Sequence, residues 1–72
     1  MTPSDIALLR EAARGFEIEA LVSRRSADMY ERQGAPGLAL TRRRESREES
    51  DKAARLRALA DEMERSLTKE QS

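Results

Sequence analysis

Between residues 6 and 30, mostly apolar side chains recur in alternating steps of three and four residues. This spacing constrains the fold more than any other feature of the sequence. It is the a/d pattern of a heptad repeat, which places one face of a single long helix against another helix. The pattern predicts a helical seam with one polar member, made of Ile6, Leu9, Ala13, Phe16, Ala20, Ser23, Ala27 and Tyr30.

A helix-start signal precedes this seam. Thr2 fits the N-cap, Pro3 the first helical position and Asp5 the acidic position of a capping box. We therefore predict a first helix from about Pro3 to Gln33.

Gly15 lies inside this predicted helix, where glycine costs about 1 kcal/mol relative to alanine. We expect Gly15 to mark a close approach of another helix backbone, and a break into two shorter helices is the alternative.

The only cluster of helix-breaking residues runs from Gln33 to Gly37. Gly34 fits the left-handed position that closes a helix, and Pro36 fits the first turn of the next one. We predict a turn over residues 34–37 and a second helix over about 38–67, with residues 68–72 disordered. So short a connection folds the second helix back antiparallel to the first. The predicted fold class is all-α: one domain over residues 1–72, an antiparallel two-helix hairpin that pairs positions whose numbers sum to about 71.

The second helix is polar in its middle, because residues 41–52 include no apolar side chain. This stretch is either a solvated helix supported by neighbouring charges, such as Arg44 with Glu48 and Arg47 with Asp51, or it frays. In the heptad register that runs through it, the seam of the second helix consists of Ala39, Arg42, Ser46, Glu49, Ala53, Leu56, Ala60, Met63 and Leu67.

A second, thinner apolar line follows the first helix. A helix that is apolar on more than one face is expected to be buried on more than one side, and one hairpin cannot cover both. We therefore expect self-association into a helical bundle, as a homodimer or larger assembly, or binding to a protein partner. This line consists of Leu8, Ala12, Gly15, Val22 and Met29, and Ile18 and Leu21 lie between it and the seam. The predicted partner contacts are Leu8, Ile18, Val22 and Met29.

Composition excludes several kinds of chemistry. The chain has no Cys and no His, so it offers no disulfide, thiol nucleophile, imidazole base or ordinary zinc site. The acidic side chains, such as Glu17 and Asp61, are interpreted as solvated helix faces, since a hairpin encloses no pocket to shift their pKa values. We expect no enzymatic activity, no cofactor and no metal. No apolar run approaches the roughly 20 residues of a membrane span, and Met1 leads directly into a helix cap, so we expect a cytoplasmic protein without a membrane span.

The chain has 14 basic and 14 acidic residues, yet between Ala20 and Arg47 there are seven arginines against three acids. Guanidinium groups suit phosphate and carboxylate ligands. Nucleic-acid binding by a dimer is therefore the alternative function, and a solvated arginine-rich face is the simpler interpretation. The candidate anion contacts are Arg24, Arg25, Arg42, Arg43, Arg44 and Arg47.

Two resemblances are limited in extent. The spacing of Ala27, Tyr30, Gly34 and Ala39 is similar to part of a tetratricopeptide repeat, but no second copy is present. In general plan and length the chain resembles the Rop-type hairpin, which implies dimerisation into a four-helix bundle and RNA binding. No residue motif carries that resemblance. The leading prediction is a small non-enzymatic interaction protein, an adaptor, inhibitor or regulator that works through an apolar helical face.

Overall fold

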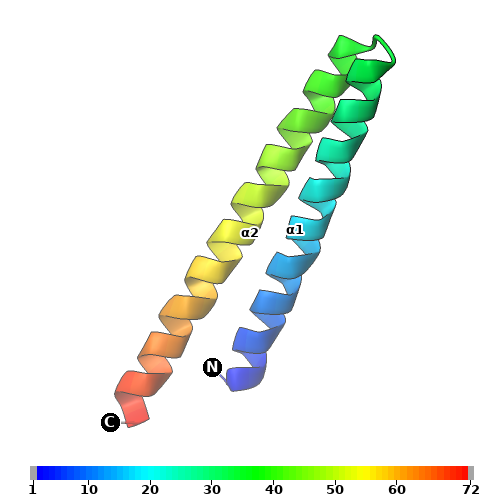
Figure 1. Ribbon diagram of the computed structural model, residues 1–72. Helices are drawn as coiled ribbons and strands as arrows, with labels where there is room; N and C mark the ends of the chain where they lie inside the picture. Colours follow the sequence, from blue (N-terminus) through cyan, green and yellow to red (C-terminus); the bar gives the residue numbers. More distant parts are fainter. Residues whose placement is uncertain (1, 72) are drawn as a thin grey trace.

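The computed structural model describes residues 2–71, which form two long helices and no strand. Helix α1 spans Pro3–Arg32 and helix α2 spans Pro36–Gln71. The helices run side by side in opposite directions, with the turn at one end and both termini at the other (Figure 1). The molecule is a rod of 58 × 14 × 12 Å. The predicted all-α antiparallel hairpin is confirmed.

Hydrogen bonds fix both ends of α1. The Thr2 N–H donates to Asp5 Oδ2 at 2.9 Å, and the Asp5 N–H donates to Thr2 Oγ1 at 3.3 Å, which completes the predicted capping box. The bond from the Thr2 backbone lowers the pKa of Asp5. At the other end, Gly34 adopts a left-handed φ of 76°, and the Ala35 N–H donates to the Tyr30 carbonyl at 2.8 Å. The left-handed glycine thus closes α1, as its position in the sequence predicts.

The seam between the helices is built from alanines. Six of them are at most 6% exposed: Ala13, Ala20 and Ala27 from α1, and Ala39, Ala53 and Ala60 from α2. Within each helix, successive alanines of this set are seven or fourteen residues apart. Their methyl groups therefore occupy one side of the seam along most of the rod. Larger seam residues such as Phe16, Leu56 and Met63 are only half-buried. This small-residue core brings the two backbones together but leaves little apolar volume inside the hairpin.

Pairing across the seam follows the predicted register. Arg10 Nη2 lies 3.1 Å from Asp61 Oδ1, and Ser23 Oγ donates to Glu49 Oε1 at 3.3 Å. The numbers of these pairs sum to 71 and 72, so the hairpin folds about the expected centre. Helix α2 continues without interruption through the polar stretch, and of the two alternatives for residues 41–52 the continuous helix is the one found.

The charge pairs that support this stretch differ from those expected. Among the described residues, neither Arg44 with Glu48 nor Arg47 with Asp51 forms an ion pair. Two other arginines of α2 are paired instead. Arg42 contacts Glu45 at 2.9 Å, and Arg43 contacts Glu31 and Asp28 of α1. Pairing across the hairpin is available because α1 places acids beside α2, whereas the prediction considered only neighbours on one helix.

The structure also differs from the sequence predictions in the bounds of α2 and in the surroundings of Gly15. Helix α2 starts at Pro36, not at about residue 38, because the fixed φ of proline suits a first helical residue. It extends to Gln71, so the predicted disorder of residues 68–72 is wrong for 68–71, and Ser72 lies outside the described residues. Helix α1 does not break at Gly15. Within the hairpin nothing lies within 4 Å of a Cβ built there, so the expected close approach is absent too.

Candidate functional site

One long edge of the hairpin, where α1 and α2 meet, carries ion pairs between the helices. On this edge, charged positions seven or fourteen residues apart on α1 meet charged positions on α2. Arg10 lies 2.7 Å from Glu64, Glu17 lies 2.6 Å from Arg57, and Glu31 pairs with Arg43. These side chains are roughly half exposed, so water screens each pair and its contribution to stability is small. The opposite signs within each pair suit the observed register of the hairpin and leave this edge polar.

The ion pairs shift the pKa values of their members in the expected directions. The hydrogen bond from Arg57 lowers the pKa of Glu17, and that from Arg43 lowers the pKa of Glu31. The carboxylates in turn raise the pKa values of the arginines, chiefly through hydrogen bonds: Glu64 for Arg10, and Glu17 for Arg57. Each acid is thus more firmly ionised and each base more firmly protonated. None of these groups is prepared for proton transfer near neutral pH.

The face of α1 directed away from α2 carries large apolar side chains in water. We call the line of Leu8, Gly15, Ile18, Val22 and Met29 the outer stripe. Its four large side chains are exposed: Leu8 by 64%, Ile18 and Val22 each by 57%, and Met29 by 40%. Leu8, Gly15, Val22 and Met29 are spaced seven apart with Ile18 between them, so they share one face of the helix. The structure brings the four predicted partner contacts onto one surface that α2 leaves uncovered.

The outer face of α2 is different. The positions opposite its seam are Arg44, Asp51, Ala58 and Arg65, all of them exposed and three of them charged. The large exposed apolar residues of α2 are Leu38 and Leu40 next to the turn and Leu59 farther along. No comparable apolar line runs along this helix within the described residues. The hairpin is therefore asymmetric, with one helix solvated on its outside and the other apolar there.

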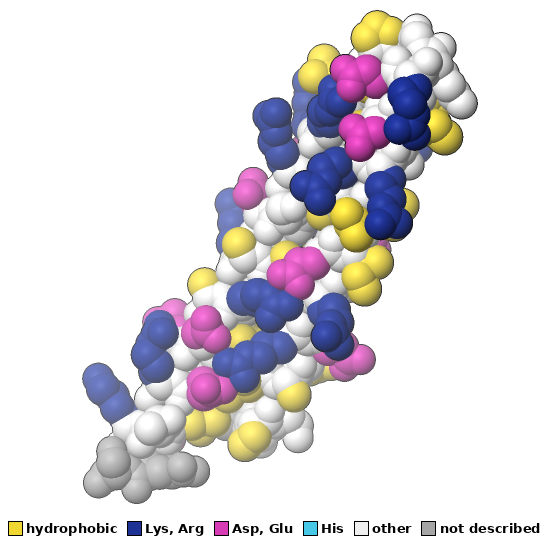
Figure 2. All heavy atoms as spheres, viewed as in Figure 1, with side chains coloured by type: hydrophobic (Ala, Val, Ile, Leu, Met, Phe, Trp, Pro, Cys, Tyr) yellow, Lys and Arg dark blue, Asp and Glu magenta, His cyan; other side chains and the backbone are white. Residues whose placement is uncertain are grey.

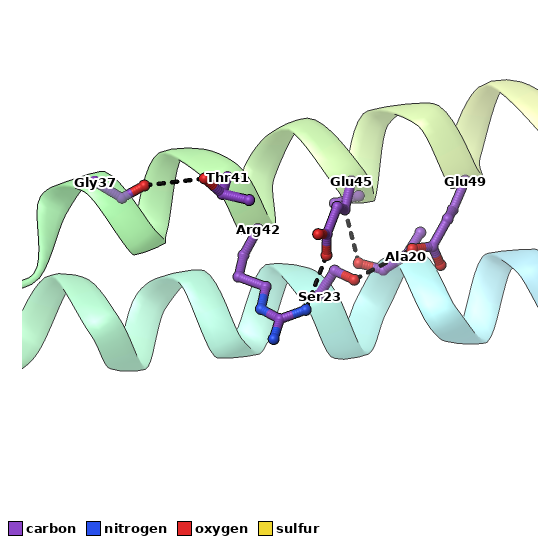
Figure 3. Close-up of polar contacts among 8 residues, drawn as sticks. Ala20, Ser23, Gly37, Thr41, Arg42, Glu45 and Glu49 are labelled. Atoms are coloured by element: carbon purple, nitrogen blue, oxygen red, sulfur yellow. Dashed lines mark hydrogen bonds and ion pairs between the residues drawn. The ribbon is translucent and has the colours of Figure 1, made fainter.

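The arginine cluster is divided among several surfaces. Arg24, Arg43 and Arg47 line one shallow hollow of about 380 Å³ together with Ser46, Ser50 and Asp51. Arg42 extends from α2 toward α1 and pairs with Glu45 (Figure 3), while Arg25 and Arg44 lie on the outer faces of their helices. On the face in view in Figure 2, basic and acidic side chains are interspersed along the rod. Only part of the predicted anion-binding set is therefore brought together.

A polar contact in the middle of the seam was not predicted. Ser23 is 9% exposed, and its hydroxyl donates to one carboxylate oxygen of Glu49, while Ser46 Oγ donates to the Ala20 carbonyl at 2.8 Å (Figure 3). The other Glu49 oxygen is buried and has no hydrogen-bond partner among the described residues. The register places Ser23 opposite the polar stretch, so the sequence did contain the signal for a Ser23–Glu49 contact. A partly satisfied carboxylate at this place costs stability.

A shallow apolar hollow at the open end of the hairpin was also missed. It has a volume of about 540 Å³, and its lining includes the apolar residues Ile6, Ala7 and Leu67 beside Arg10 and Glu64. Sequence reasoning placed Ile6 and Leu67 in the seam without recognising that the seam is open there. The hollow adds accessible apolar area on the same molecule as the outer stripe.

Neither a metal-binding cluster nor a membrane-spanning helix is found among the described residues. Within residues 2–71 no group of three or more acidic side chains is arranged to hold a metal ion. In the same part of the chain, neither helix combines the length and apolar character that a membrane crossing needs. The surface features that remain are the outer stripe and the divided arginines. In comparisons with protein-family models, with curated proteins and with solved structures, nothing matches this chain.

Proposed function

We propose that this protein is a small non-enzymatic interaction module, an adaptor, inhibitor or regulator that binds a protein partner through the outer stripe. One observation carries the proposal. Four large apolar side chains are 40–64% exposed along one face of α1, in a chain of which 39% of the residues are charged. Scattered exposed apolar residues are ordinary, but large apolar side chains that recur on one face at heptad spacing are typical of a helix that packs against another helix.

The energetics favour a covered stripe. Burying a large aliphatic side chain contributes on the order of 1.5–3 kcal/mol, and the outer stripe holds four such side chains per hairpin. The alanine seam buries little apolar volume by comparison, and a 72-residue chain is close to the size below which a single core is marginal. We propose that two hairpins associate into a helical bundle, as a homodimer or larger assembly, when no other partner is bound.

Val22→Glu tests this proposal, with Ala58→Glu as the matched control. Val22 is exposed in the hairpin, so the variant keeps its fold, but any partner that covers the stripe would bury an unpaired charge. We expect Val22→Glu to abolish association in sedimentation equilibrium at micromolar concentration, with helicity unchanged by circular dichroism. Ala58→Glu, on the solvated face of α2, should associate normally. Equal association by both variants would contradict the proposal.

Nucleic-acid binding is the second candidate, because Arg24, Arg43 and Arg47 share one hollow. Arg43 is already paired with two acids, and Asp51 lines the same hollow. Both features weaken the attraction of the hollow for phosphate. In the same experiment, replacing Arg24 and Arg47 by alanine should leave association unchanged. If the wild-type chain binds RNA or duplex DNA with an affinity that falls steeply with salt, and this variant loses that binding, the second candidate is favoured.

A further inference from the structure

A second heptad line runs along the outside of α1 and includes two charged residues of opposite sign. From Leu8 to Met29 it steps by three and four through Leu8, Glu11, Gly15, Ile18, Val22, Arg25 and Met29. Glu11 lies seven residues before Ile18 and Arg25 lies seven residues after it. The line is therefore nearly symmetric about Ile18, with an acid on one side and a base on the other. When two copies of this line are placed side by side in opposite directions, the acid of each copy therefore meets the base of the other.

We propose that the partner covering the outer stripe is a second copy of this chain, packed antiparallel against α1 with the two-fold axis beside Ile18. This inference rests on the proposed function and identifies its partner. In the antiparallel arrangement Glu11 of each copy faces Arg25 of the other, and Leu8 lies near Met29. A parallel pair would instead place Glu11 beside Glu11 and Arg25 beside Arg25, which is unfavourable. Charge complementarity thus selects both the occupant and its direction.

The free state of these two side chains agrees with this role. Glu11 and Arg25 are both exposed, and neither forms an ion pair with another described residue. Three charged residues of α1 that lie beside α2, namely Arg10, Glu17 and Glu31, are paired with it. Helix α2 cannot reach Glu11 or Arg25 because they lie on the opposite side of α1. They are therefore available to a molecule that packs on that side.

Gly15 supplies a second, independent argument. Glycine weakens a helix interior relative to alanine, and no packing within the hairpin requires it, since the space around its Cα is open. In the antiparallel pair, Gly15 of one copy lies beside Ile18 and Val22 of the other. A missing side chain there accommodates a large one and lets the two α1 helices approach closely. The glycine is explained by a second copy and not by the hairpin.

Reciprocal charge reversal tests the pairing. Glu11→Arg alone or Arg25→Glu alone should weaken homodimerisation about tenfold, since each replaces two attractive contacts by two repulsive ones. An equimolar mixture of the two variants should form heterodimers with near wild-type affinity, because every facing pair then has opposite signs. Native mass spectrometry distinguishes the three dimers by mass. Absence of preferential heterodimer formation would overturn the arrangement.

Single cysteines test the direction, since the chain contains none of its own. In the antiparallel pair, two copies of residue 29 are about 30 Å apart along the helix axis, and so are two copies of residue 8. Oxidation by glutathione disulfide should therefore cross-link Leu8→Cys to Met29→Cys in a mixture and neither variant to itself. Self-cross-linking of Leu8→Cys would show a parallel pair, which overturns this inference and leaves the proposed function standing.

The oligomeric state separates the remaining outcomes. A wild-type chain that stays monomeric at several hundred micromolar overturns the second copy as partner. The proposed function survives that result only if a different protein partner is bound and Val22→Glu abolishes its binding. Dimerisation that neither Glu11→Arg nor Val22→Glu weakens would place the contact on another face and overturn both.

Discussion

Replacing Ala53 by leucine should lower the free energy of unfolding by about 1–3 kcal/mol. Ala53 is 1% exposed and lies in the alanine seam, so three more carbon atoms there would have to fit between the two helices. The hairpin can accommodate leucine only by separating α1 from α2 locally or by forcing an unfavourable rotamer. For a domain of this size, the loss corresponds to a fall of roughly 4–8 °C in Tm per kcal/mol.

Ala58→Leu is the matched control. It makes the same chemical change five residues later on the same helix, but Ala58 lies on the exposed outer face of α2. Both variants pay the same small helix-propensity cost, so the difference between their urea midpoints isolates the packing of the seam. Equal midpoints would mean that the seam tolerates a larger residue and that the helices are not closely packed there.

Removing the polar pair Ser23 and Glu49 should have the opposite effect. We expect the double variant Ser23→Ala with Glu49→Leu to raise the free energy of unfolding by about 1–3 kcal/mol. Glu49 has one buried carboxylate oxygen without a partner, and its other oxygen receives a single long hydrogen bond of 3.3 Å from Ser23. Leucine fills a similar volume and brings no charge into the seam. Both partners are changed together so that no polar group is left unpaired.

Urea denaturation at neutral pH measures this effect, and Glu48→Leu is the control. Glu48 is exposed beside Glu49, so its replacement should change the free energy of unfolding by less than about 0.5 kcal/mol. A double variant less stable than the wild-type protein would show that the buried pair contributes net stability. It would also raise the question of whether the pair fixes the register of the seam.

The fold was predictable because two independent signals agreed. The steps of three and four define a buried face on each half of the chain, and the breaker residues between Gln33 and Gly37 leave only one place to fold back. Every member of the predicted α1 seam, from Ile6 to Tyr30, is buried or half-buried. The cap at Thr2 and the left-handed Gly34 follow from local chemistry alone, which sequence rules describe well.

The incorrect predictions concern segments and side chains about which the apolar periodicity gives no information. The last turns of α2 have no apolar anchor after Leu67, yet no residue there breaks a helix, and extending an existing helix costs little. The charge pairs on α2 were assigned to neighbours along one helix, because the sequence does not show that Arg43 can reach Glu31 and Asp28 on the other. Long flexible side chains have several partners within reach, and spacing alone does not choose among them.

The outer stripe was predictable both in its large apolar residues and in its exposure, since one hairpin cannot cover two apolar faces of the same helix. Spacing placed Leu8, Ile18, Val22 and Met29 on a second face of α1, and the structure shows that α2 covers none of them well. The near-symmetry of this line about Ile18 was missed, although the predicted seam already indicates which face of α1 lies outside the hairpin, and the structure gives direct knowledge of that face. This knowledge also changes the interpretation of Gly15. The residue was expected to mark a close helix approach, but it lies on the outer face of α1 with open space beside it.

Thiol labelling measures most directly whether the outer stripe is covered in solution. The chain has no cysteine, so Val22→Cys and Ala58→Cys each introduce a single exposed thiol, on the outer faces of α1 and α2. The rate of reaction with a maleimide is followed as the protein concentration rises from nanomolar to hundreds of micromolar. We predict that labelling of Val22→Cys slows at least tenfold while labelling of Ala58→Cys stays constant. Equal, concentration-independent rates for the two thiols would contradict association through this face.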